Sequence, residues 1–345
     1  MKIAIIGLGP AGILALALLP DAALKNVVVF EPAAIGGDLA TKYAAVVANI
    51  PKSVIVAAFR GVPRWSSTPF PLLDVYADDA CPPLGVVAKQ LRLLITPLLG
   101  TVEFHSDKVV KILYNSAAAS QQPPWSLRTQ TNKLFEVQVV MNCTGAEPKS
   151  MNLPLPTIPL HVALMPALLA AHVSPYDSVV VFGTAHSGTL VLKNLRDAGV
   201  SSITAIYKST TPFVYARDGA SEGIKQESAA IADEIKAGTW GTATPALLSY
   251  NDFAAVYRAV HSSTAAVYAC GFNKGDLQIE KDGVLTSYTH DGARFVDAPP
   301  GIYGFGIGFP SLYTGNDGKQ YPDIGFGGFI DTIKPVLIAI PLLDA

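Results

Sequence analysis

The apolar residues of this chain gather in short runs separated by glycine-containing turns. Residues 3–6 (IAII) and 27–30 (VVVF) are continuous apolar runs of strand length, and residues 10–19 between them have the length and composition of a helix. Strands of a buried parallel sheet have this continuous apolar character. Residues 1–30 therefore predict a strand, a helix and a second strand, which together form a βαβ unit.

The same order recurs in the middle of the chain. Residues 179–182 (VVVF) predict a strand, a helix is expected from about residue 186, and residues 203–207 (ITAIY) predict the next strand. Strands that alternate with helices in this way are typical of α/β folds with a parallel sheet. We therefore expect two Rossmann-like units in one chain.

The rest of the chain predicts loops, strands and helices in a mixed order. The stretch from 31 to 83 is rich in proline and glycine and predicts long loops. Further helices are expected at 84–98, within 164–172, in the polar stretch from about 221 to 260, and from about 328 onward. Short strands are expected at 102–105, 109–114, 125–129, 134–145 and, with glycine turns, between 264 and 310.

Composition excludes several classes of protein. Half of the residues are hydrophobic, 15% are charged and the net charge is −2, so neither a disordered chain nor a nucleic-acid-binding surface is expected. The three cysteines (Cys81, Cys143 and Cys270) are far apart in the sequence, so no redox dithiol is expected. No spacing of His, Cys, Asp or Glu residues suggests a metal site. Glycines and Pro10 interrupt the apolar N-terminus, which argues against a signal peptide or a membrane span. We expect a soluble, cytoplasmic protein.

The first glycine turn, GLGPAG, has the spacing G-x-G-x-x-G directly after the first strand. In such a turn Gly7 permits the tight bend, Gly9 lets the backbone approach a pyrophosphate and Gly12 lets helix and strand pack closely. Pro10 and Ala11 open the helix, whose free N–H groups favour an anion. The turn therefore predicts a dinucleotide site.

The second turn, GTAHSG, keeps Gly183 and Gly188 but has Ala185 in place of the middle glycine. His186 and Ser187 stand at the expected helix N-terminus, where they are candidates to contact a phosphate; Ser187 is equally well explained as a residue of the first helical turn. This turn predicts a second dinucleotide site.

The residues that follow the second strand of each unit favour two different nucleotides. Glu31 ends the strand 27–30, where a carboxylate accepts hydrogen bonds from a ribose 2′-OH and repels a 2′-phosphate. Lys208 follows the strand 203–207, with hydroxyl side chains next to it and Arg217 further on, and cations suit a 2′-phosphate. A solvated lysine at a strand end is the alternative for Lys208.

FAD held permanently and NADPH as its reductant are the simplest pair of dinucleotides for these two turns. We expect residues 1–157 and 262–345 to form the FAD domain, with residues 158–261 inserted as the NAD(P)H domain. The fold class is then α/β, with two nested Rossmann-like dinucleotide-binding domains whose sites face each other across a cleft.

Several segments, in matching order, resemble the flavin-containing monooxygenases, a family within the flavoproteins that have two dinucleotide-binding folds. The similarity lies in the order of an acid, a double glycine, a tyrosine and an asparagine, then a Thr-Gly turn, then a histidine-bearing segment before the second glycine turn. The segments are FEPAAIGGDLATKYAAVVANIPKS (30–53), VVMNCTGAEPKSMNLP (139–154), PLHVALMPAL (159–168), VVVFGTAHSG (179–188), AAVYACGFN (265–273) and GIYGFGIGFP (301–310).

The resemblance implies that NADPH reduces the flavin, that oxygen adds to give a hydroperoxyflavin, and that a soft nitrogen or sulfur atom of a small molecule accepts one oxygen atom. It implies that Asn49 faces the flavin and takes part in catalysis. It also implies that Gly36 and Gly37 pass close to the FAD pyrophosphate, and that Thr144 and Gly145 close over the cofactor.

Three departures from the family pattern keep other functions open. No F-x-G precedes His161, Cys270 stands where the family has threonine, and Ala185 replaces a glycine. The alternatives are an FAD-dependent NAD(P)H dehydrogenase without a redox dithiol, and a flavoprotein-like binding protein without turnover. No motif predicts the substrate, and none predicts an oligomeric state.

Overall fold

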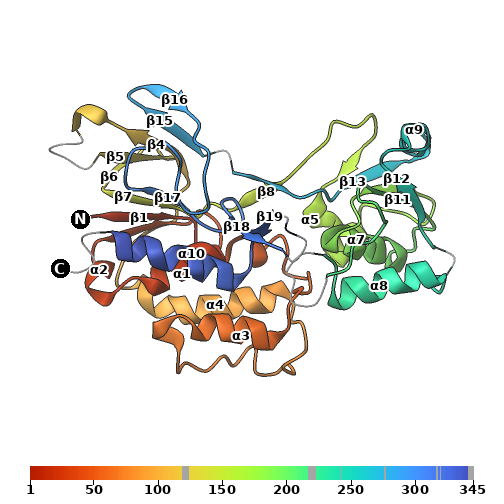
Figure 1. Cartoon of the computed structure of the whole chain (residues 1–345), viewed down its shortest axis with the longest axis horizontal. Helices are drawn as coiled ribbons and strands as arrows, with labels where there is room; N and C mark the ends of the chain where they lie inside the picture. The colour runs from red at the N-terminus through yellow and green to blue at the C-terminus, as the bar shows by residue number, and fades with distance from the viewer. Residues whose placement is uncertain are drawn as a thin grey trace.

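The computed structural model describes residues 1–118, 124–216, 223–241, 243–275, 277–315, 318 and 320–340. Two parallel sheets, each with five strands in the described part, form two α/β units that lie side by side (Figure 1). The first sheet contains, in spatial order, β17 (Ile302–Gly304), β7 (Val139–Asn142), β1 (Ile3–Ile6), β2 (Val27–Phe30) and β3 (Glu103–His105). The first unit therefore combines strands from both ends of the chain.

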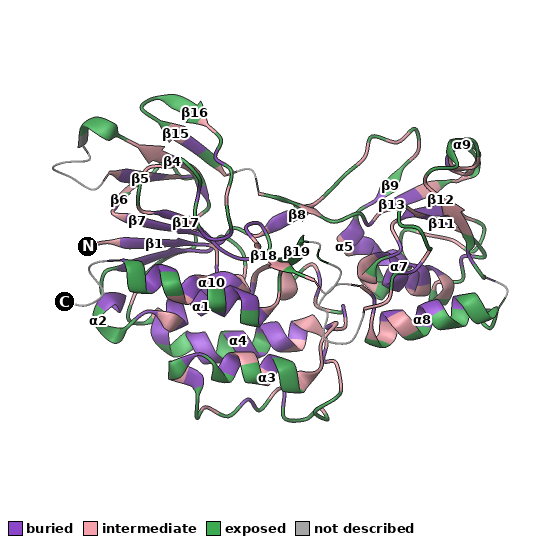
Figure 2. Cartoon of the chain, in the orientation of Figure 1, coloured by how far each residue is buried: buried purple, intermediate pink, exposed green. Residues whose placement is uncertain are grey.

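Helices cover one face of this first sheet. α1 (Pro10–Leu18) is buried along residues 11–17 and packs against α10 (Phe326–Ala339) and α4 (Leu84–Leu99), with α3 (Lys52–Arg60) beyond them (Figure 2). Because α1 lies between the sheet and other helices, it is apolar on all sides, as a fully enclosed helix requires. The short elements α2 (Asp21–Leu24), η1 (Gly37–Leu39), η2 (Pro63–Trp65) and η3 (Ser116–Ala118) lie in the same unit.

A mixed sheet covers the other face. It contains β16 (Val284–Thr286), β15 (Gln278–Lys281), β4 (Val109–Tyr114), β5 (Trp125–Thr129) and β6 (Leu134–Val137). Trp125 and Leu127 of this sheet share one apolar cluster with Ala4 and Val28 of the parallel sheet. The first unit thus has three layers, namely helices, parallel sheet and mixed sheet.

The run 134–145, which was expected as one strand, is divided at Gln138. Its first part is β6 in the mixed sheet, and its second part is β7 in the parallel sheet. The Gln138 N–H donates to the Lys2 carbonyl (2.9 Å), where the chain changes from one sheet to the other. Both halves are apolar, so the pattern of the sequence does not reveal the division.

The second unit is built on the other parallel sheet. Its strands are β12 (Ala246–Ser249), β11 (Ser202–Tyr207), β10 (Ser178–Phe182), β13 (Ala265–Tyr268) and β9 (Thr157–Ile158). α5 (Leu160–Ala163), α6 (Pro166–Leu169), α7 (His186–Asp197), α8 (Gln226–Ala237) and α9 (Phe253–Ser262) surround it. Because β13 pairs with β10, this sheet extends to Tyr268, beyond the expected boundary at residue 261. The division into domains stays a proposal.

Two short strands connect the units. β8 (Ala146–Pro148) leaves the first unit, β14 (Phe272–Lys274) returns to it, and the two pair antiparallel with Pro148 opposite Phe272. A hairpin of β18 (Ser311–Thr314) and β19 (Gln320–Asp323) precedes α10. Within the described residues, none of the helices has the length and apolar character needed to span a bilayer.

Two elements differ in kind from the expectation. α3 lies inside the stretch that was expected to be loop. Its buried residues Ile55 and Phe59 hold it in place, and the Phe59 ring packs edge-on against Phe326 of α10, with 5.3 Å between the ring centroids. β12 lies inside the stretch that was expected to be helical and pairs with β11. In both cases tertiary packing decides the local structure.

Candidate functional site

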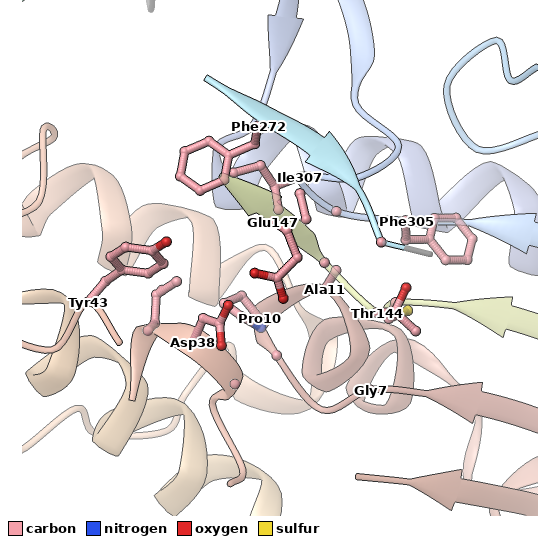
Figure 3. Close-up of a pocket in the computed structure, with 18 of the residues that line it drawn as sticks. Gly7, Pro10, Ala11, Asp38, Tyr43, Thr144, Glu147, Phe272, Phe305 and Ile307 are labelled. Carbon is pink, nitrogen blue, oxygen red and sulfur yellow. The ribbon is translucent and has the colours of Figure 1, made fainter. Parts of the chain in front are cut away.

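A chamber of about 890 Å³ receives residues from both units. The first glycine turn, the loop from Gly37 to Ile50 and the segment 143–147 form much of its wall (Figure 3). His186 and Ser187, at the N-terminus of α7 in the second unit, also line it. The structure therefore brings the first turn and the helix start of the second turn to one cavity.

Eleven predicted site residues line this chamber, and six others do not. The lining residues are Gly7, Gly9, Pro10, Ala11, Glu31, Gly37, Asn49, Thr144, Gly145, His186 and Ser187. Gly12, Gly36, Gly183, Ala185, Gly188 and Lys208 lie outside its wall. Arg217 lies outside the described residues.

The glycines of the first turn serve two different purposes. Gly7 has a φ of +94°, and a Cβ there would lie 2.6 Å from the Cys143 carbonyl oxygen; a Cβ on Gly12 would lie 1.9 Å from the Gly7 oxygen. The fold itself therefore requires these two glycines. Gly9 has a φ of −68°, which any residue adopts, and a Cβ there would meet no protein atom within 4 Å. Only a ligand needs that space.

The double glycine lies directly against this turn. The Gly36 N–H donates to the Leu8 carbonyl (2.7 Å), and a Cβ on Gly37 would lie 2.9 Å from the Gly9 Cα. Both glycines have positive φ values, +102° and +58°. The loop thus brings a second stretch of bare backbone next to the helix N-terminus, which fits an elongated anionic group such as a pyrophosphate.

Glu31 is buried at the end of β2 and holds the turn in place. Its carboxylate accepts the Leu8 N–H (2.7 Å) through Oε2 and the Ala33 N–H (2.9 Å) through Oε1. A carboxylate has about four acceptor positions, so two hydrogen bonds leave capacity for a ribose hydroxyl. A role in ribose binding stays a proposal.

The end of β7 is tied to the C-terminal segment of the chain. The Thr144 hydroxyl donates to Asn142 Oδ1 (2.8 Å), and Gly145 has a φ of +76°. A Cβ on Gly308 would lie 2.3 Å from the Gly145 oxygen, so the two backbones are in close contact. Asn49 lies half-buried in the chamber wall.

The second turn repeats the geometry of the first. A Cβ on Gly183 would lie 2.6 Å from the Ala269 oxygen, and one on Gly188 would lie 2.0 Å from the Gly183 oxygen. Ala185 has φ −77° and ψ −171°, close to the −68° and −176° of Gly9. Alanine therefore fits without strain, and its methyl group keeps a ligand further from the backbone than Gly9 does.

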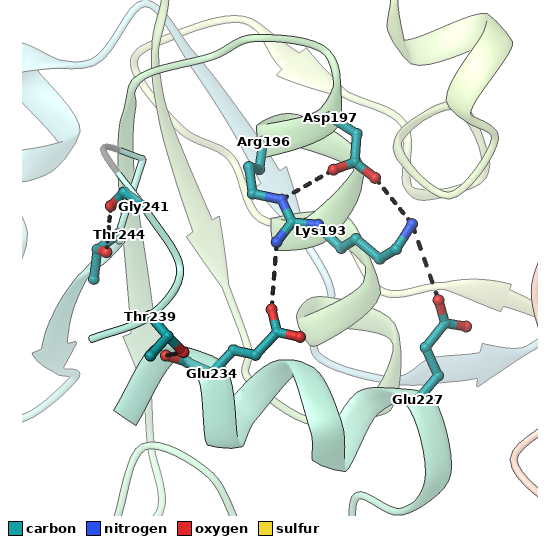
Figure 4. A network of polar contacts seen from close by, with 8 residues as sticks. All are labelled: Lys193, Arg196, Asp197, Glu227, Glu234, Thr239, Gly241 and Thr244. Carbon is teal, nitrogen blue, oxygen red and sulfur yellow. Dashed lines mark hydrogen bonds and ion pairs between the residues drawn. The ribbon is translucent and has the colours of Figure 1, made fainter. Parts of the chain in front are cut away.

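A polar network fastens α7, which this second turn opens, to α8 (Figure 4). Lys193 pairs with Asp197 (2.9 Å), and Arg196 pairs with Asp197 (2.9 Å) and Glu234 (3.5 Å). Partly exposed ion pairs contribute little to stability, but the Arg196 guanidinium also lies 4.0 Å from the Trp240 ring centroid. These contacts fix the helix whose N-terminus faces the chamber.

Lys208 is exposed at the end of β11, and Lys149 lies near the same place. Burial raises the pKa of the Cys270 thiol, and both lysines are close enough to oppose that rise. A Cβ on Gly183 would lie 3.4 Å from Cys270 Sγ. The Lys149 N–H donates to the Gly271 carbonyl (2.9 Å) and the Gly183 N–H to the Ile206 carbonyl (2.8 Å), so both lysines follow segments that are bonded next to the second turn. Lys149 was not predicted as a site residue, because it follows a strand of the first unit.

His186 contacts both units. Its Nδ1 lies 3.1 Å from the Ser228 hydroxyl of α8, and its imidazole lies close to the Val47 backbone of the first unit. Burial lowers the pKa of His186 below its ordinary value, and the nearby Lys225 lowers it further. His186 is therefore neutral at neutral pH.

A pH dependence of stability follows from this lowered pKa. As the pH falls below 6.5, the unfolded chain takes up a proton at His186 that the folded protein resists, so the free energy of unfolding decreases. Urea unfolding at about pH 7.5 and about pH 5.5 should show that the free energy of unfolding decreases less between these two pH values for His186→Gln than for the unaltered protein. Equal losses in the two proteins would contradict this account.

Many chamber residues were not predicted as site residues. Among them are Asp38, Tyr43, Glu147 and Phe272, and the neighbouring Lys42 forms ion pairs with both carboxylates. All five lie in segments that resemble the flavin-containing monooxygenases, and this was the only signal for them: Asp38, Lys42 and Tyr43 in 30–53, Glu147 in 139–154 and Phe272 in 265–273.

Comparisons with known proteins agree with this architecture. No protein-family model matches the chain. A curated relative, Monooxygenase AgnR1 of Paecilomyces divaricatus, is 26% identical, with 96% of each chain covered. The flavin-containing monooxygenase from Stenotrophomonas maltophilia superposes with a TM-score of 0.64 at 13% identity, covering 100% of this chain and 99% of that one. An NADP⁺-bound cyclohexanone monooxygenase from Rhodococcus sp. Phi1 gives 0.59 at 14% identity, with 99% and 86% covered.

The identities to the solved structures are low, so these structures establish the fold. The resemblance predicted from the sequence and the predicted fold class are both confirmed at this level. The chain is similar to the flavin-containing monooxygenases and has the fold of the flavoproteins with two dinucleotide-binding domains.

Proposed function

We propose that this protein is a monooxygenase that uses FAD and NADPH to transfer one atom of molecular oxygen to a soft nitrogen or sulfur atom of a small molecule. One observation carries the proposal: the first glycine turn and the helix start of the second line the same chamber. The ring ends of an FAD whose pyrophosphate lies at the first turn and of an NADPH whose pyrophosphate lies at the second can therefore meet inside this chamber.

The residues of the chamber fit these cofactors. The open space at Gly9, the loop at Gly37 and the free capacity of Glu31 suit the pyrophosphate and ribose of FAD. The second turn, with Lys208 and Lys149 nearby, suits NADPH. Bound FAD supplies a ring that accepts a hydride and then reacts with oxygen. The monooxygenase relative and the NADP⁺-bound structural neighbour support this assignment.

The described cysteines favour a monooxygenase over a disulfide reductase. Cys81, Cys143 and Cys270 are all free, and none of them lies next to another in the sequence. Burial strongly raises the pKa of the Cys143 thiol, which keeps it protonated and unreactive. Free thiols also fit a reducing compartment, and we propose the cytoplasm.

The proposal is tested by the absorbance spectrum of the purified protein, first with NADPH in the absence of oxygen and then after mixing with oxygen. A monooxygenase should show flavin bands that bleach with NADPH and, with oxygen, a long-lived spectral species before the bands return. Immediate return of the oxidised bands would indicate a dehydrogenase or oxidase instead. A protein that binds no FAD would contradict the proposed function altogether.

Replacing Asn49 with alanine should separate reduction from oxygen transfer. The amide of Asn49 is a half-buried donor in the chamber wall, and a donor aimed at developing negative charge is worth about a hundredfold in rate. We expect Asn49→Ala to be reduced by NADPH at a nearly normal rate but to release hydrogen peroxide instead of oxygenated product. An unchanged ratio of product to peroxide would assign Asn49 a structural role.

A further inference from the structure

The hydroxyl of Tyr43 is a buried polar group without a hydrogen-bond partner. Tyr43 is 8% exposed, and among the described residues no group lies within hydrogen-bonding distance and angle of its oxygen. The residue lines the chamber, and Figure 3 shows its hydroxyl end turned toward Glu147 and Phe272. Leaving a buried donor unpaired costs free energy, so such an atom in a cavity wall points to a ligand atom that pairs with it.

Tyr43 lies at the end of the chamber beside the second unit. It belongs to the same apolar cluster as Leu160 and Leu164 of that unit, and its ring meets Phe272 edge-on at 6.2 Å between centroids. These contacts fix the ring on two sides, so the direction of the hydroxyl is set before any ligand arrives.

The charges around the hydroxyl decide what it binds. Lys42 pairs with Asp38 (3.2 Å) and Glu147 (3.3 Å), so two carboxylates share one ammonium and leave one excess negative charge. Burial, together with these two carboxylates, raises the pKa of Tyr43, so the phenol keeps its proton and can donate it. Its partner is then an acceptor atom of the ligand.

The excess negative charge disfavours a phosphate directly beside the Tyr43 hydroxyl, although the two carboxylates are partly exposed and solvent screens them. Phosphates are favoured at the N-terminus of α7, where His186 and Ser187 line the chamber. The part of the ligand beside Tyr43 is therefore a neutral or cationic ring that carries an acceptor. A carboxamide or ring carbonyl oxygen has this chemistry, and it occurs on both nicotinamide and isoalloxazine.

We propose that Tyr43 is a dinucleotide-binding residue whose hydroxyl donates a hydrogen bond to an amide-type carbonyl oxygen at the ring end of a bound dinucleotide. The assignment rests on the proposed function, since it presupposes that FAD and NADPH bind in this chamber.

The test compares Tyr43→Phe with the unaltered protein in two titrations, FAD into the apoprotein and NADP⁺ into the FAD-loaded protein. Loss of one hydrogen bond should weaken one of the two affinities by about 3- to 10-fold. A weaker NADP⁺ affinity assigns the nicotinamide carboxamide as the acceptor, and a weaker FAD affinity assigns the flavin ring. The thermal unfolding midpoint should not fall, because the hydroxyl has no hydrogen bond to the protein.

Tyr288→Phe is a matched control. Tyr288 is also 8% exposed, and its hydroxyl is likewise buried without a well-formed hydrogen bond, with the Thr286 side chain beside it; it does not line the chamber. Tyr288→Phe should bind both dinucleotides normally. Unchanged affinities in Tyr43→Phe, or equal losses in both variants, would overturn the assignment. An unaltered protein that binds neither dinucleotide would instead refute the proposed function, and the assignment with it.

Discussion

Gly9→Ala should leave the protein folded but weaken FAD binding, whereas Gly12→Ala should destabilise the fold itself. The two glycines are three residues apart in one turn, yet a Cβ on Gly9 meets no protein atom within 4 Å and a Cβ on Gly12 would lie 1.9 Å from the Gly7 oxygen. We expect Gly12→Ala to lose about 3 kcal/mol or more, since the backbone must move to admit the methyl group. Gly9→Ala should lose no more than about 1 kcal/mol, the usual effect at a helix N-cap.

The measurements are thermal unfolding without FAD and the dissociation constant of FAD for each variant. We expect Gly9→Ala to bind FAD roughly tenfold more weakly or worse, equivalent to about 1.4 kcal/mol. If Gly9→Ala bound FAD normally, the pyrophosphate would not approach the backbone at Gly9 closely enough to meet an added methyl group. If Gly12→Ala were as stable as the unaltered protein, the close contact described here would be wrong.

Replacing Glu31 with alanine should lower both stability and FAD affinity. The Leu8 N–H, which is fully buried, would lose its acceptor, and a buried donor left unpaired costs about 2 kcal/mol. Loss of the acceptor for the Ala33 N–H costs less free energy, because Ala33 is exposed and water can replace the carboxylate. The glycine turn would also lose a side chain that fixes its geometry, so FAD binding should weaken beyond the loss of any ribose contact.

Glu31→Gln separates these effects. Glutamine keeps one acceptor oxygen, so it can still pair with the Leu8 N–H but offers a donor where the Ala33 N–H lies. We expect urea unfolding to place its stability between those of the unaltered protein and Glu31→Ala. If Glu31→Ala were as stable as the unaltered protein, the carboxylate would have no structural role at the turn.

The parts of the fold that the sequence predicted are those with a local cause. The strands predicted at 3–6 and 27–30 are confirmed as β1 and β2. They were predictable because four consecutive apolar residues followed by a turn fit a buried strand better than any other element. The glycine turns are predictable for a similar reason. The positive φ of Gly7 and the contact at Gly12 depend on residues that are close in the sequence or in the adjacent strand.

The parts that were missed have causes far away in the chain. Gln138 changes sheets because of its bond to Lys2, and α3 forms because Phe59 packs on α10 near the C-terminus. Much of the candidate site is of this kind. Tyr43 and Phe272 meet only because the two units are folded against each other, and no local pattern reveals that one of these side chains carries an unpaired hydroxyl.

The paired linkers β8 and β14 have a consequence for how the second unit entered the chain and how it can move. Since Pro148 lies opposite Phe272, a tight two-residue turn would suffice to join these ends, so the whole unit occupies the position of a hairpin loop. An insertion at such a position leaves the register of the flanking strands untouched. We expect a unit attached through a two-stranded ribbon to move most readily by torsion about the ribbon axis. Such torsion would turn the α7 end of the unit toward or away from the first glycine turn while its point of attachment stays fixed.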